Sequence, residues 1–248
     1  MKIPNHIITC VAFSLIACGV INAQAPATPP KTWSGNVGGG FAFTDGNSDT
    51  RNFNLSFAAT RDPKTKNVIK WTGLYLRGDK EGAETIDRAT TTLRDEYTLS
   101  QRVFTFGQLD YLRDRFKEIM FLWSPIAGVG YKLINKDTVT MSIDNGLGGV
   151  WERNPGHDTT GSGAYNAAER VNWKLSKTAA INQAVTGLWK TKQFSDALYN
   201  TTLGVAASVT QNTQIKFEIN DIYKARPTAA TLRKNDVAVI TAFVVKFQ

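Results

Sequence analysis

Hydrophobic residues recur at every second position over much of this chain, in segments of about ten to fourteen residues that run from Trp33 to the end. The clearest segment is the last, 236–248, whose alternate positions carry an apolar face: Val237, Val239, Thr241, Phe243, Val245 and Phe247. A period of two is typical of a β-strand whose two faces meet different surroundings. Strands of this length can cross an outer membrane with one face on lipid and the other on a barrel interior. The pattern therefore predicts membrane-spanning strands.

The alternating segments number about twelve, and polar or glycine-containing connections separate them. Counted from the N-terminus, the even-numbered connections are short and lie around Lys64, Gln101, Lys136, Lys177 and Asn212. The odd-numbered set includes the longer stretches around Glu81, His157 and Thr228. An even strand number brings both ends of a barrel to the periplasm. We therefore predict an all-β fold, an antiparallel transmembrane β-barrel of about twelve strands with short periplasmic turns. Counts of about ten or fourteen also fit, because each strand signal is weak by itself.

A soluble β-sandwich also has alternating strands, so the character of the two faces must decide between the folds. Trp71, Trp151 and Trp173 stand among aliphatic residues near segment ends, where the aromatic girdles of a membrane barrel belong. The opposite faces carry polar residues such as Asn54 and Glu218. These groups would be costly in a dry sandwich core, whereas a wet barrel lumen tolerates them. The distribution favours the barrel.

The N-terminal region indicates export. A basic residue precedes an apolar run over 7–21 that is too short to span a bilayer, and small residues follow that run. This is the layout of a secretory leader. We predict a signal peptide over 1–23, a short periplasmic linker over 24–32 and an outer-membrane barrel over 33–248. A second interpretation of the leader is a lipobox at 15–18, in which Cys18 is lipidated and becomes the mature N-terminus.

Composition narrows the chemistry further. Both cysteines, Cys10 and Cys18, lie in the predicted leader, so the mature chain has no disulfide framework and no thiolate site. We predict no cofactor and no metal. The formal net charge is +8, which in an exported protein indicates outer-membrane lipid, lipopolysaccharide or small solutes as partners, and not nucleic acid. The barrel assembly machinery is a further expected partner, with the C-terminal assembly signal at Phe243, Val245 and Phe247.

Several stretches of the chain resemble one known family. The segments 97–117 (YTLSQRVFTFGQLDYLRDRFK) and 128–134 (GVGYKLI), together with 33–38 and 44–50, are similar to the YdiY-like family of salt-induced outer-membrane proteins, a domain-of-unknown-function family. The resemblance covers essentially the whole mature chain. It implies an outer-membrane barrel and carries no catalytic motif, and the salt response in the family name implies something about expression, not a mechanism.

The inventory of residues also argues against catalysis. Outer-membrane hydrolases use a histidine base, and the only histidines here are His6 in the leader and His157 in a predicted outer loop. Asp158 and Ser162 lie close to His157 in the sequence, but a solvated loop rich in Gly, Ser and Thr accounts for them more simply. We predict that the protein is not an enzyme.

If the apolar faces contact lipid, a set of charged residues points into the lumen: Lys70, Arg94, Glu96, Asp144, Arg170, Lys174, Lys190, Lys192, Lys216, Glu218 and Lys246. Cations outnumber anions in this set. One hypothesis is a narrow channel for small anionic or polar solutes, with selectivity set by rings of charge. The alternative is a non-conducting structural barrel with a side-chain-filled lumen, in which Arg94 and Glu96 act as plugs. Lumen width depends on strand number and shear, so the sequence leaves both hypotheses open.

Overall fold

The computed structural model of the chain describes residues 32–44, 50–229 and 231–247. The predicted signal peptide, the candidate lipidation site Cys18 and all of the predicted linker except Thr32 lie outside these residues. The first outer connection, 45–49, also lies outside them. The single helical element in the described part of the chain is a 3-10 turn, η1. No helix there is long and apolar enough to cross a bilayer.

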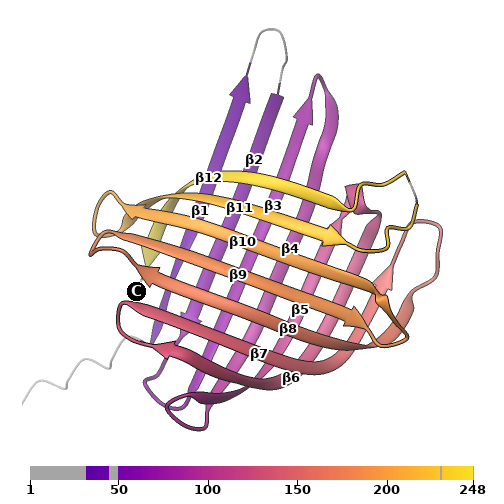
Figure 1. Cartoon of the computed structure of the whole chain (residues 1–248). Helices are drawn as coiled ribbons and strands as arrows, with labels where there is room; N and C mark the ends of the chain where they lie inside the picture. The colour runs from indigo at the N-terminus through magenta and orange to yellow at the C-terminus, as the bar shows by residue number, and fades with distance from the viewer. Residues whose placement is uncertain (1–31, 45–49, 230, 248) are drawn as a thin grey trace, which may run out of the picture. The chain divides into compact units, whose positions relative to one another are not determined.

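Twelve antiparallel strands make up the described part of the chain and close into a barrel, as predicted (Figure 1). Each strand pairs with its neighbours in sequence, and β1 pairs with β12 to close the ring. The strands are β1 (Trp33–Thr44), β2 (Thr50–Arg61), β3 (Asn67–Lys80), β4 (Ala83–Thr98), β5 (Val103–Asp114), β6 (Ile119–Asn135), β7 (Val139–Arg153), β8 (Thr160–Lys174), β9 (Ala179–Lys190), β10 (Gln193–Ser208), β11 (Thr213–Lys224) and β12 (Asn235–Phe247), with η1 (Arg115–Lys117) between β5 and β6.

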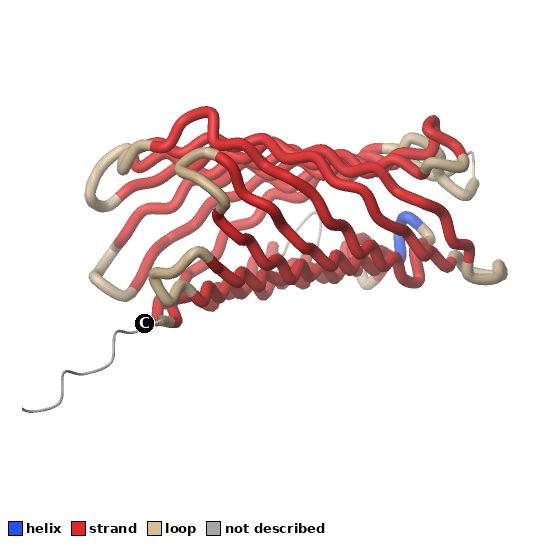
Figure 2. Tube along the Cα trace, turned by 90° about the horizontal axis from the view of Figure 1, so that it is seen from below, coloured by secondary structure: helices blue, strands red, loops and turns tan. Residues whose placement is uncertain are grey.

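The connections fall into two sets at opposite ends of the barrel (Figure 2). One end of the barrel holds the first residue of β1 and the last residue of β12. All the connections at this end are short: 62–66, 99–102, 136–138, 175–178 and 209–212. We assign this end to the periplasm because it holds both ends of the barrel. The opposite end, called the outer end below, holds connections that range from the two-residue turns 81–82 and 191–192 to the segment 225–234.

The expected long connection around Glu81 is wrong. β3 continues to Lys80 and β4 begins at Ala83, so the polar stretch 78–88 forms the tip of a hairpin. Glu81 has φ 53° and Gly82 has φ 78°, and two successive residues of positive φ make a tight hairpin turn. The polar composition of this stretch reflects strands that continue beyond the lipid, and it does not mark a loop.

The outward-facing side chains match a membrane environment. Large hydrophobic residues such as Leu147, Phe217 and Val239 are exposed on the outer wall. Aromatic residues flank this apolar surface at both ends: Trp33, Trp71, Tyr97, Tyr131 and Trp173 near the periplasmic end, and Tyr111, Trp123, Trp151, Tyr165, Trp189 and Tyr199 towards the outer end. Two such girdles are typical of barrels that span a bilayer.

Two inward-facing glycines leave room for an aromatic ring inside the barrel. Gly128 on β6 and Gly146 on β7 are register partners, and the ring of Phe106 on β5 lies over both. A Cβ at Gly128 would collide with the Asn145 carbonyl oxygen and would lie 2.8 Å from the Phe106 ring. The small residues therefore fix the position of Phe106.

We expect Gly128→Val to destabilise the barrel by about 1–3 kcal/mol, because overpacking against backbone cannot be relieved by a rotamer change. Urea titration of the refolded barrel, read from its heat-modifiable gel mobility, measures this loss. The control is Gly107→Val, since Gly107 has no atom within 4 Å of a Cβ built on it. Equal loss in both variants would contradict the packing role of Gly128.

Candidate functional site in the barrel interior

A network of charged side chains crosses the lumen near the periplasmic end. We call it the charged belt, and its members are Lys70, Arg94, Glu96, Gln108, Asp144 and Arg170. They come from β3, β4, β5, β7 and β8. The belt therefore joins strands that are not neighbours in the barrel wall.

Arg94 is the centre of the belt. Its guanidinium donates from Nε to Glu96 Oε1 at 2.8 Å, from one terminal nitrogen to Gln108 Oε1 at 2.7 Å and from the other to Asp144 Oδ2 at 3.0 Å. Only 4% of Arg94 is exposed. Three directed contacts on a planar, permanently charged group hold it in one orientation.

The face of the same guanidinium lies against an aromatic ring. The Arg94 Cζ lies 3.8 Å from the centroid of the Phe106 ring and 5.8 Å from that of Phe104. A cation over an aromatic face is attracted by the ring quadrupole, most strongly where water is excluded. The position of Phe106, which Gly128 and Gly146 allow, therefore also sets the position of Arg94.

Asp144 links the two arginines of the belt. Its Oδ2 accepts from Arg94 and also from Arg170 NH1. Asp144 is 1% exposed, and its Oδ1 has no partner among the described groups. The other side of the belt ends in Lys70, whose Nζ donates to Glu96 Oε2 at 2.7 Å. Opposite charges thus alternate from β3 to β8.

Apolar side chains occupy the lumen between the belt and the outer end. This apolar layer consists of Leu112, Leu122, Val150, Leu188, Leu198 and Ile222, which come from β5, β6, β7, β9, β10 and β11. A cavity of about 230 Å³ lies beside it, lined also by Thr92, Asp110, Asn166 and Arg170. Apolar side chains therefore pack this part of the lumen, and a partly polar cavity lies next to the belt.

A second group of buried charges, the outer cluster, lies beyond the apolar layer. In one half, Glu152 accepts from Lys190 Nζ at 2.7 Å and from Lys224 Nζ, and Lys190 also pairs with Asp196 at 2.6 Å. In the other half, Arg88 Nε donates to Asp114 Oδ2 at 2.7 Å, and Lys117 Nζ lies 2.9 Å from an Asp236 carboxylate oxygen. Charges at both ends of the lumen are thus neutralised by partners on other strands.

The charged residues that sequence predicts for the lumen occupy four kinds of place. Five belong to the charged belt: Lys70, Arg94, Glu96, Asp144 and Arg170. Lys190 belongs to the outer cluster, while Lys216 pairs with Glu218 at 2.5 Å and Lys246 donates to Ser208 at 3.2 Å. Lys174 and Lys192 are exposed at the two ends of the barrel, and Lys192 Nζ donates to the Gly161 carbonyl oxygen. These two do not join the networks of the interior.

Sequence reasoning missed most of the outer cluster. Arg88, Glu152 and Lys224 are not among the lumen positions predicted from the sequence. The signal that could have found them is the alternation of inward and outward positions along each strand. On β7 the inward positions run from Asp144 through Gly146, Gly148 and Val150 to Glu152, and the same alternation leads along β4 from Arg94 to Arg88. Extending each alternation to its last matching residue would have found them.

The described residues hold no group of three or more His, Cys, Asp and Glu side chains placed to bind a metal ion. His157 is exposed in the outer connection 154–159, and its backbone N–H donates to the Asn154 carbonyl oxygen. The C-terminal residues Phe243, Val245 and Phe247 are exposed on the lipid face of β12. The charged interior is therefore the candidate functional site.

Comparison with known proteins identifies the family. The model of a family described as a protein of unknown function, DUF481, matches residues 37–247. The chain belongs to the DUF481 family. No curated protein matches its sequence.

Solved structures similar to this DUF481 barrel are outer-membrane proteins. The NanC porin aligns with a TM-score of 0.51 and 9% identity, over 87% of this chain and 99% of the porin. An outer-membrane channel from Pseudomonas putida F1 aligns with a TM-score of 0.51 and 11% identity, over 90% of this chain and 100% of the channel. At these identities the likeness concerns the fold, which is that of a bacterial outer-membrane barrel. The DUF481 protein is located in the bacterial outer membrane.

We expect Asp144→Ala to destabilise the barrel by about 3–5 kcal/mol, because it leaves the buried Arg94 and the partly buried Arg170 beside each other without their shared anion. The free energy of unfolding in urea measures the effect. Asp137→Ala is the control, since Asp137 is exposed in the turn 136–138 and its loss should change stability by less than about 0.5 kcal/mol. A small effect at Asp144 would mean that water, and not Asp144, compensates the arginines.

Proposed function

We propose that this outer-membrane barrel rests in a non-conducting state, in which the charged belt and the apolar layer fill its lumen. The observation that carries the proposal is the placement of Arg94. Its guanidinium is almost fully buried and binds groups on β4, β5 and β7 at once. A side chain held in this way obstructs the passage that an open pore would need.

The balance of charge also supports a closed barrel over an open anion channel. Within the belt and the adjoining cavity, three cations (Lys70, Arg94 and Arg170) face three carboxylates (Glu96, Asp110 and Asp144). In the outer cluster, Glu152 and Asp114 offset the lysines and arginines that bind them. The cationic excess expected from sequence is therefore largely neutralised, and little free positive charge remains to select anions.

A narrow channel for small polar or anionic solutes is a second candidate. The cavity of about 230 Å³ beside the belt favours it, because Thr92, Asp110, Asn166 and Arg170 offer polar groups there. This candidate supposes that a rotamer change of Arg94 joins the cavity to the periplasmic mouth. Under this candidate function the belt acts as a gate. The conductance experiment described next distinguishes the two candidates. Neither function requires a catalytic step.

Electrical conductance of the refolded protein in planar bilayers tests the closed-barrel proposal against the channel. We expect the parent to show no steady current, and Arg94→Ala combined with Glu96→Ala to produce discrete openings, because the double change removes the side chains that cross the lumen at the belt, next to the cavity beside the apolar layer. Steady anion-selective openings of the parent would instead establish the channel. A double variant that folds and stays closed would refute the role of Arg94 and Glu96 as plugs.

The matched control is Arg115→Ala combined with Glu84→Ala. These residues form an ion pair of the same kind, 2.6 Å between Arg115 NH1 and Glu84 Oε2, at the outer end. Arg115 is exposed there. Loss of this pair should leave conductance at the level of the parent.

A further inference from the structure

The seam between β1 and β12 is closed over only part of its length. The two strands pair over five residues, from Gly35↔Phe247 to Gly39↔Phe243. Beyond that point β1 continues to Thr44 paired with β2, and β12 is paired only with β11 back to Asn235. The outer parts of the two strands diverge, as Figure 1 shows. The ladder between β1 and β12 therefore ends at Gly39 and Phe243, and the edge of β12 from Asp236 to Ala242 has no register partner on β1.

The divergence begins at a close contact between Gly40 and β12. A Cβ at Gly40 would collide with the Thr241 carbonyl oxygen. That oxygen accepts a hydrogen bond from the Asn54 side-chain Nδ2 at 3.2 Å. A side chain of β2 thus reaches past β1 and binds a carbonyl group at the edge of β12.

An open strand edge is costly against lipid, because each unpaired backbone group loses several kcal/mol of hydrogen bonding. Such an edge persists in a membrane barrel where it borders a polar or occupied space. The open seam therefore indicates that something other than hydrocarbon lies behind it.

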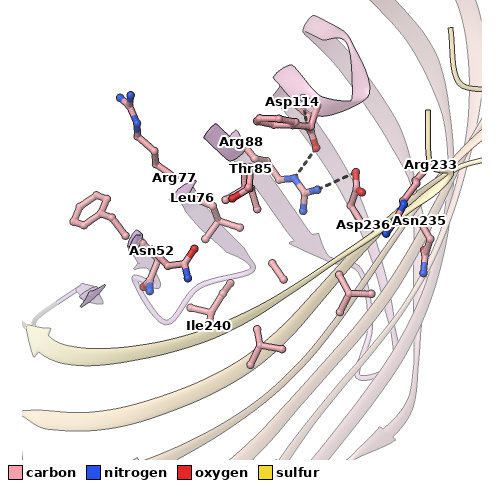
Figure 3. A pocket seen from close by; sticks show the side chains of 17 residues that line it. Asn52, Leu76, Arg77, Thr85, Arg88, Asp114, Arg233, Asn235, Asp236 and Ile240 are labelled. Carbon is pink, nitrogen blue, oxygen red and sulfur yellow. Dashed lines mark hydrogen bonds and ion pairs between the residues drawn. The ribbon is translucent and has the colours of Figure 1, made fainter. Parts of the chain in front are cut away.

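Two cavities follow the seam. The larger, about 550 Å³, lies between β2, β3, β4 and β12 (Figure 3). The smaller, about 330 Å³, lies where β1 and β12 part, and Asn52, Asn54 and Val239 line both. A volume of this size suits a small organic ligand.

The lining of the larger cavity is apolar on the lipid side and polar inside. Phe53, Val237 and Val239 belong to the outward-facing apolar surface, and Val239 is 75% exposed. Arg88 and Asp114 belong to the interior, where they are paired with each other. The cavity therefore connects the membrane-facing surface with the lumen.

The polar part of the cavity contains a cation and a hydrogen-bond acceptor that a ligand could bind. Asp236 is already neutralised by Lys117, at 2.9 Å, and lies 3.7 Å from Arg88. Arg233 lines the same cavity and pairs with no carboxylate in the described part of the chain. The Oδ1 atom of Asn54 is buried and accepts no hydrogen bond from any described group. An anionic group and a hydrogen-bond donor would meet partners here.

We propose that the outer half of the β1–β12 seam is a lateral port, and that the cavity behind it binds a single-chain amphiphile with an anionic headgroup. The headgroup lies at Arg233, and the chain leaves through the seam along Val237 and Val239 into the surrounding lipid. The port does not depend on the lumen being open or closed, because it enters the barrel above the apolar layer.

Blocking the seam tests the port. Val239→Cys places a single thiol in its lining, since residues 33–248 contain no other cysteine. Modification with N-phenylmaleimide should reduce the affinity of the vesicle-reconstituted barrel for dansyl-labelled undecanoic acid by about tenfold or more, or about 1.4 kcal/mol at tenfold. Protein-free vesicles give the background. Val245→Cys lies on the same face of β12, in the part paired with β1, and its modification should leave binding unchanged.

Saturable binding that survives modification at Val239→Cys would overturn the port, as would the absence of saturable binding in the unmodified barrel. Neither result bears on the conductance of the parent or of the Arg94→Ala, Glu96→Ala variant. Failure of the port and failure of the closed-lumen proposal are therefore separate observations.

Replacing the cation tests the headgroup. Arg233→Ala should weaken binding of the labelled acid about tenfold, which is the scale of one charge-assisted hydrogen bond. It should not change binding of the corresponding labelled alcohol. Arg226→Ala is the control, because Arg226 lies in the same outer connection but does not line the cavity. Equal weakening of acid and alcohol by Arg233→Ala would overturn the anionic headgroup.

Discussion

The structure depends on one constraint, which is that no backbone hydrogen-bonding group in the membrane can be left facing lipid. Twelve strands meet it by closing into a ring, apart from the outer half of the β1–β12 seam, and the ring forces each strand to present alternate residues to lipid and to the interior. Everything else in the interior follows from which residue types occupy the inward positions. The belt, the apolar layer and the outer cluster are successive inward positions of the same strands.

The interior of this barrel is organised more like a protein core than like an aqueous pore. The buried charges of the described residues form ion pairs, and some of these pairs join strands that lie apart in the wall, as with Arg94 on β4 and Asp144 on β7 or Lys224 on β11 and Glu152 on β7. Such pairs add contacts across the ring to the hydrogen bonds around it. Their arrangement also sets a requirement for precision, because a buried charge that loses its partner costs more than the pair contributes.

Period-two alternation was sufficient to predict the fold and a strand number of about twelve, and it predicted inward positions for Arg94, Glu96 and Asp144. It could not predict that these side chains meet, because contacts across a lumen depend on shear and on which strands face each other. The ends of the strands were the least accurate part of the prediction. The polar tips of β3 and β4 extend beyond the lipid, and their composition is typical of a loop. The partial pairing of β1 with β12 was also beyond a pattern that treats each strand alone. Gly40 and Asn54 are unremarkable in sequence and decisive only where the ring closes.

The uneven outer connections have a consequence for how the cell surface presents this protein. Hairpins at 81–82 and 191–192 turn within two residues, and the η1 connection adds only 115–118. The tip of the β3–β4 hairpin nevertheless projects from the barrel (Figure 1). Among the described connections, 154–159 and 225–234 are the two longest at the outer end. Among the described parts of the outer end, antibodies or phage that approach from outside would therefore meet these two segments and the β3–β4 tip, and sequence changes driven by such encounters should concentrate there.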